Sequence, residues 1–110
     1  MTEDKLKQKI AEGANAGQAI HSFLKSRIES EEKPTPVKFK FHAWADAERV
    51  RNSWLKYKKA HEECKLEFDD WYIMLKDGET TKSVKPKHLN AYAERVVYGM
   101  LTTKRRLIIE

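Results

Sequence analysis

Hydrophobic side chains recur at every third or fourth position over residues 47–75. The series comprises Ala47, Val50, Trp54, Tyr57, His61, Cys64, Phe68, Trp71 and Leu75. Residues at these offsets lie on one side of an α-helix, and neither Gly nor Pro interrupts the stretch. Asp77-Gly78 follows it, and Gly is the favoured residue just past a helix end. The pattern therefore predicts one long helix over residues 45–76.

Two further helices are expected, one on each side of this stretch. Apolar residues at helical spacing follow Thr2, a residue type that caps helices, and they predict a helix over residues 3–31. The small residues at 13–17 leave two interpretations open, because another helix could approach closely there or the helix could break. We expect a continuous or kinked helix. Pro86 is favoured at the first position of a helix, and the apolar spacing after it predicts a helix over residues 86–104.

Residues 37–42, Val-Lys-Phe-Lys-Phe-His, alternate apolar and polar side chains. This alternation is typical of a β-strand, but an extended connector that covers the core would show it too. A strand would need a partner, and residues 106–109 offer one. We predict an all-α fold, a three-helix bundle in a single domain over residues 1–110. It has an extended linker at 35–43 and, as an option, a two-stranded ribbon of 37–42 with 106–109.

Composition limits where the protein works. The chain has 110 residues, of which 35% are charged, and one cysteine. A single cysteine excludes an internal disulfide and fits a reducing compartment. No stretch approaches the ~18 consecutive apolar residues of a membrane-spanning helix. We therefore expect a cytoplasmic protein without a membrane segment.

No cluster of residues indicates catalysis, a metal or a cofactor. His61 and Cys64 lie one helical turn apart, but zinc needs at least three protein ligands. Asp69 and Asp70 are adjacent in sequence and would point about 100° apart on a helix. A glycine-rich phosphate loop and a nucleophile elbow are both missing from the sequence. We expect a protein that is not an enzyme.

The net charge of +5 is unevenly distributed along the chain. Residues 34–60 carry seven bases and two acids, residues 61–80 two bases and seven acids, and residues 81–110 seven bases and two acids. The long helix would thus be basic in its first half and acidic in its second. The helix macrodipole favours the opposite order, so local helix energetics do not explain this distribution.

An antiparallel pairing of the second and third helices would gather ten bases at one end of the molecule, which we call the basic pole. Its members are Lys38, Lys40, Arg49, Arg51, Lys56, Lys58, Lys59, Lys104, Arg105 and Arg106. Such a cluster attracts polyanions, although a solvated lysine-rich surface is the plainer interpretation. We expect a small binding module that docks on nucleic acid, or on a protein that handles nucleic acid, through this pole.

A protein-binding function is the alternative. Residues 71–75 are apolar on nearly all sides of a helix, the tail is apolar, and exposed apolar patches mark interaction sites. The candidate contacts are Trp71, Tyr72, Ile73, Met74, Leu107, Ile108 and Ile109. The protein would then be an adaptor, an inhibitor or an assembly subunit, and its partner could be a second copy. The build resembles that of small helical accessory proteins of phages and mobile elements, but no motif fixes one family.

Overall fold

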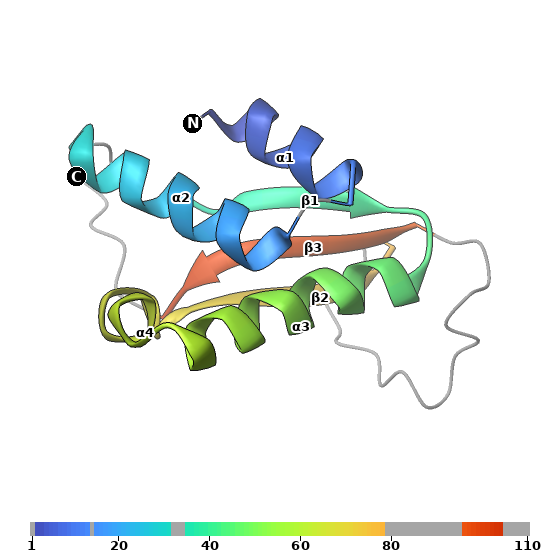
Figure 1. The fold of residues 1–110 in the computed structure, drawn as a ribbon. Coiled ribbons are helices and arrows are strands. Elements are labelled where there is room, and N and C mark those ends of the chain that lie inside the picture. Colours follow the sequence, from blue (N-terminus) through green and yellow to red (C-terminus); the bar gives the residue numbers. More distant parts are fainter. Residues whose placement is uncertain (1, 14, 32–34, 79–95, 105–110) are drawn as a thin grey trace.

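A three-stranded sheet and four helices make up the part of the chain that the computed structural model describes, which is residues 2–13, 15–31, 35–78 and 96–104 (Figure 1). In chain order the elements are α1 (Glu3–Ala11), α2 (Ala16–Glu29), β1 (Val37–Phe41), α3 (Trp44–Ala60), α4 (Glu62–Phe68), β2 (Trp71–Asp77) and β3 (Val97–Thr103). The fold is α+β, and the prediction of an all-α three-helix bundle is wrong.

The sheet is antiparallel, with the strand order β1-β3-β2. Its register pairs Phe39 with Gly99 and Ile73 with Leu101. The expected extended linker at 35–43 is wrong, because Val37–Phe41 is hydrogen-bonded into the sheet. The alternative interpretation of 37–42 as a strand is correct over these five residues. The observed partner is β3, and the proposed partner 106–109 lies outside the described residues.

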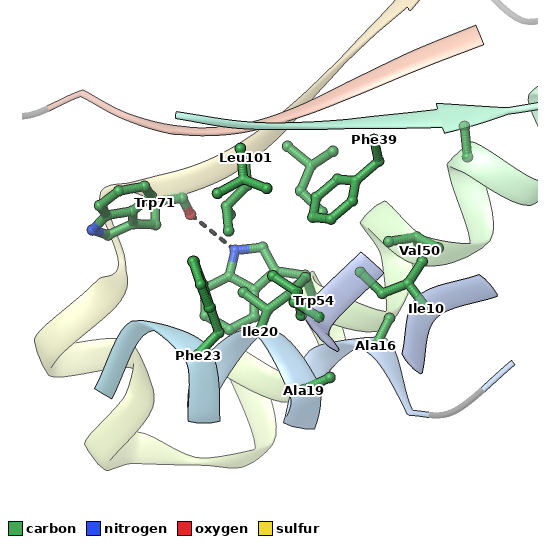
Figure 2. Packing of buried hydrophobic residues seen from close by; sticks show 14 of the residues in the cluster. Ile10, Ala16, Ala19, Ile20, Phe23, Phe39, Val50, Trp54, Trp71 and Leu101 are labelled. Atoms are coloured by element: carbon green, nitrogen blue, oxygen red, sulfur yellow. Dashed lines mark hydrogen bonds between the residues drawn. The ribbon is translucent and has the colours of Figure 1, made fainter. Parts of the chain in front are cut away.

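The molecule has two layers, a sheet and a layer of helices on one of its faces. Figure 2 shows the strands on one side, the helices on the other and the core side chains between them. Alternate strand residues point into this core, among them Val37, Phe39 and Phe41 of β1. The residues between them form the opposite surface, which we call the outer face of the sheet. Successive side chains of a strand point to opposite faces, so each strand contributes residues to both the core and the outer face.

Trp54 of α3 is at the centre of the core. Its side chain is fully buried, and its indole N–H donates to the Trp71 carbonyl of β2 at 3.0 Å (Figure 2). The predicted apolar face of this helix is correct as far as Trp54, because Ala47, Val50 and Trp54 are all buried.

The predicted long helix over 45–76 is wrong beyond Ala60. His61 adopts an extended backbone (φ −122°, ψ 98°) and separates α3 from the short α4. Glu62 and Glu63 are consequently in the first turn of a new helix, where the macrodipole favours acidic residues. This placement explains two of the seven acids that conflicted with the macrodipole of a single long helix.

The predicted continuous helix over 3–31 is also wrong, because the chain turns between α1 and α2. Gly13 has φ +80°, a conformation that glycine adopts without steric cost, and Asn15 caps α2 by accepting from Gln18 N. The Thr2 cap of α1 is confirmed, since its hydroxyl accepts from Lys5 N. The helix therefore breaks at residues 13–17, as one interpretation of these small residues allowed. The other interpretation, close approach of another helix, is correct at Gly17.

Gly17 provides the close approach between α2 and α3. Its N–H donates to Ser53 Oγ at 3.1 Å. A Cβ at this position would lie 2.4 Å from Tyr57 Cβ and 2.6 Å from the Ser53 carbonyl oxygen. Only glycine lets the two helices pack at this distance.

The third predicted helix over 86–104 is wrong where the structure describes it, since residues 97–103 form β3. Positions 86–95 lie outside the described residues. Across the described helices, none has the length and apolar character needed to cross a membrane.

Candidate functional site

The outer face of the sheet combines basic, aromatic and thioether side chains. Its members alternate with the buried residues of the three strands and are Lys38, Lys40, Tyr72, Met74, Lys76, Tyr98, Met100 and Thr102. The two β1 lysines are exposed and the other six residues are partly buried. The surface is thus accessible, and it lacks the uniformly polar character of most solvated sheet faces.

Tyr98 occupies the central strand and has a lysine opposite it on each side. Lys40 of β1 and Lys76 of β2 are both its cross-strand partners, and side chains in directly opposed positions are close enough to interact. A third lysine, Lys38, places its ammonium 4.0 Å from the centre of the Tyr98 ring. The Tyr98 ring therefore has one ammonium over it and a lysine in the opposed position of each neighbouring strand.

Two methionines and a second tyrosine continue this surface. Met100 opposes Met74 across β3 and β2, and Tyr72 opposes Thr102 one row further along. Lys104, just past the end of β3, places its ammonium 5.8 Å from the centre of the Tyr72 ring. Tyr98, the methionine pair and Tyr72 thus form a diagonal track of apolar side chains with lysines on its borders.

An acidic residue is found at one corner of this surface. Asp70 precedes β2, its carbonyl accepts from the Lys104 N–H at 3.0 Å, and its carboxylate accepts from Thr103 Oγ1 at 3.3 Å. The rows of Tyr98 and Met100 contain lysines and no acid. Among the described residues of this surface, lysines are therefore concentrated in the rows of Tyr98 and Met100.

The structure describes eight of the ten residues of the predicted basic pole and distributes them over two layers. Lys38, Lys40 and Lys104 belong to the sheet, whereas Arg49, Arg51, Lys56, Lys58 and Lys59 are on α3 in the helical layer. Arg49 forms an ion pair with Asp46 at 3.5 Å, and Arg51 forms one with Glu48 at 3.9 Å. Positions 105 and 106 lie outside the described residues.

Lys58 has a structural role. Its side chain is 7% exposed, and its ammonium donates to the Asp69 and Trp71 carbonyls at 3.2 and 2.9 Å. Burial holds the pKa of Lys58 below its usual range. This ammonium connects α3 to the start of β2 and is not available to an external ligand.

The described residues among those predicted for protein binding are divided between the core and the outer face of the sheet. Trp71 and Ile73 are buried in the core, whereas Tyr72 and Met74 are on the outer face. The apolar character of 71–75 is thus explained by a strand that has one face in the core. Positions 107–109 lie outside the described residues.

Sequence reasoning missed Tyr98, Lys76 and Met100 as site residues. The available signal for a strand was the alternation of Val97, Gly99 and Leu101 with larger side chains. It was overlooked because the segment was interpreted as a helix.

Neither His61 nor Cys64 contributes to a reactive site. Cys64 is fully buried, and burial raises the pKa of its thiol to about 11, so the nucleophilic thiolate does not form near neutral pH. Among the residues placed by the structure, no three His, Cys, Asp or Glu side chains are grouped so that they could hold a metal ion.

His21 is the titratable group most relevant to stability near neutral pH. It bonds Tyr57 Oη through Nδ1 at 3.2 Å and meets the Phe68 ring edge-on. Burial, then the charge of Lys25, lower the pKa of His21, and His61 adds to this while Glu67 and Glu63 oppose it. The folded state therefore favours neutral His21.

We expect the free energy of unfolding to decrease as the pH falls below about 6.5, the usual pKa of histidine. In this range the unfolded chain binds more protons at His21 than the folded chain does, so acid favours unfolding. Urea titrations between pH 7.5 and 5.5 should show the loss, and the H21Q variant should show a shallower one. Identical pH profiles for both proteins would contradict the expectation.

Comparison with known proteins gives no match, so the function of the outer face is inferred from the chemistry of its side chains. No protein-family model matches the chain, and neither a curated protein nor a solved structure matches it.

Proposed function

We propose that the protein is a non-enzymatic module that binds nucleic acid on the outer face of its sheet. The observation that carries the proposal is the Tyr98 ring, which has Lys40 and Lys76 opposite it and the Lys38 ammonium 4.0 Å from its centre. Nucleic acids carry negatively charged phosphates and flat aromatic bases. On this surface the lysines can pair with the phosphates, and the tyrosine rings can stack on the bases. The buried thiol of Cys64 fits work in a reducing compartment, and we propose the cytoplasm.

Lysine contacts supply affinity through the phosphates. Each lysine that neutralises a phosphate releases condensed counterion, so binding weakens as salt is added. Lys38, Lys40, Lys76 and Lys104 are on or beside the track of Tyr98, Met100, Met74 and Tyr72, and they could contact a backbone that follows it.

The rings supply a second kind of contact. A cation–π contact at an exposed site contributes about 0.5–1 kcal/mol, whereas a base stacked on an aromatic side chain contributes about 1–3 kcal/mol. A base can therefore replace the Lys38 ammonium over Tyr98 with a net gain. An acidic protein could also pack on the tyrosines and methionines, because both residue types are enriched at protein interfaces. Nucleic acid is the preferred ligand because it combines phosphates for the lysines with bases that stack on the rings.

The exposed side of α3 is a weaker candidate. A shallow hollow there includes Arg49, Lys56 and Tyr57, but also Glu48. Arg49 already pairs with Asp46, and Tyr57 is stacked on His61 with ring centres 4.0 Å apart. This surface therefore offers less uncompensated charge and no free ring.

The test is a fluorescence-anisotropy titration of labelled DNA and RNA, single-stranded and duplex, at 50 and 200 mM salt. With four lysines in contact, the slope of log affinity against log salt should be about −3 for a single strand, which is about a fifty-fold loss over this range. Absence of binding to every nucleic acid at 50 mM salt would overturn the proposal.

A further inference from the structure

We infer that the nucleic acid bound on the outer face is a single strand, with one base stacked on Tyr98 and another on Tyr72. This inference rests on the proposed function and specifies its ligand. Both tyrosines occupy outer-face positions of their strands and are partly accessible. The bases of a duplex are stacked on one another inside the helix, so a duplex presents phosphates to the lysines and leaves both rings unused.

The distance between the rings determines how the strand crosses the sheet. Tyr98 is opposite Lys76, and Tyr72 is four residues before Lys76 on β2. At about 3.3 Å per residue along a strand and about 4.8 Å between strands, the two tyrosine positions are roughly 14 Å apart. Consecutive stacked bases of a nucleic-acid strand are only about 3.4 Å apart. Two neighbouring bases of a stacked strand therefore cannot reach both tyrosine positions, so at least one base lies between the two that stack. We infer an extended strand, because a base that stacks on a tyrosine gives up stacking on its neighbour.

Met74 and Met100 fill the space between the two tyrosine rows. Their thioethers are polarisable and adapt to the edge of an aromatic ring. They form a permissive contact for the intervening base, because they offer no directional hydrogen bond that would select one base over another. We therefore expect little sequence preference.

Lys38 has two successive positions in this arrangement. In the free protein its ammonium covers the Tyr98 ring at 4.0 Å. The incoming base takes that place, and the released ammonium is then beside the sugar–phosphate backbone that joins this base to its neighbours. Lys40 and Lys76, one on each side of Tyr98, do not need to move.

The experiment compares a single-stranded 12-mer with the duplex of the same sequence, by anisotropy at several salt concentrations. The variants are Y98L, Y72L, Y98F and K40Q. Y98L and Y72L should each weaken single-strand binding about tenfold with an unchanged salt slope, because they remove a ring and no charge. Y98F keeps the ring and should bind the single strand almost as tightly as the wild-type protein. K40Q should instead reduce the magnitude of the slope by about 0.7.

A 2-aminopurine base within the 12-mer gives a direct readout of stacking. At saturating protein its fluorescence should be lower on the wild-type protein than on the Y72L/Y98L double variant, because only the wild type stacks the base on a tyrosine ring. Thermal melts of each variant establish that it is folded before binding is compared.

The outcomes separate the two proposals. If the duplex binds as tightly as the single strand, or if Y98L and Y72L leave both affinity and quenching unchanged, the stacking inference is wrong and the proposed function stands. If no nucleic acid binds at 50 mM salt, the proposed function itself is wrong.

Discussion

Replacement of Lys38 and Lys40 by glutamate is expected to abolish nucleic-acid binding at physiological salt. The K38E/K40E variant removes two proposed phosphate contacts and places two acids beside Tyr98, in rows whose charged residues are all lysines. A loss of affinity of about a hundredfold or more follows from the lost counterion release and the added repulsion. Both side chains are exposed, so the far-UV spectrum should be unchanged. Anisotropy titrations at 150 mM salt measure the effect.

A variant of α3 with the same change in charge is the matched control. Lys56 and Lys59 are exposed residues of α3 in the helical layer. K56E/K59E should weaken binding only through the general field of the protein, by a few-fold at moderate salt where screening is strong. If this variant loses as much affinity as K38E/K40E, the interface is not specific to the outer face of the sheet.

Truncation of Trp54 to alanine is expected to have the largest effect on stability. Its indole is fully buried, and its N–H joins α3 to β2 through the Trp71 carbonyl. Removal of a buried tryptophan costs about 3–5 kcal/mol, which is a large part of the stability of a domain of this size. W54A should therefore unfold at much lower urea, as followed by circular dichroism.

Leu55 provides the control for this substitution. It is the next residue along α3, and its side chain is 48% exposed. L55A should shift the urea midpoint little, because little apolar surface leaves the core. Similar midpoints for W54A and L55A would contradict the central role of Trp54.

The parts of the fold that the sequence predicted correctly are those set by local signals. The Thr2 cap is a bond between near neighbours, and the apolar face of α3 follows from spacing within one helix. The alternation in β1 fits a strand with one buried face, which was the alternative to the expected linker. Each of these features can be read from a few adjacent residues.

The remaining elements depend on contacts between distant segments. Trp71 and Leu75 are four residues apart, which fits one face of a helix, but Trp71, Ile73 and Leu75 also fit one face of a strand. Pairing with β3 decides between them. The acids at 62 and 63, together with their conflict with the macrodipole of one long helix, were the available sign that a new helix begins there.

The candidate site shows the same limit. Lys38 and Lys40 were identified from charge alone, and the structure places them on an open surface. Their proximity to Tyr98 and Met100 arises from a register that joins positions about sixty residues apart in the printed sequence. Charge clustering could suggest a polyanion, whereas the aromatic half of the surface required the pairing of β1 with β3.

The strand order has a consequence for how the protein is made. β3 follows β1 and β2 in the sequence but lies between them, and it is the strand with which both are paired. A nascent chain that has left the ribosome only as far as β2 has no partner for either strand, and its apolar strand residues stay uncovered. Long-range pairings of this kind form slowly, and exposed strands are prone to aggregation. The sheet is therefore assembled only after residue 103 has emerged, and fragments that stop before β3 should need a chaperone to remain dispersed.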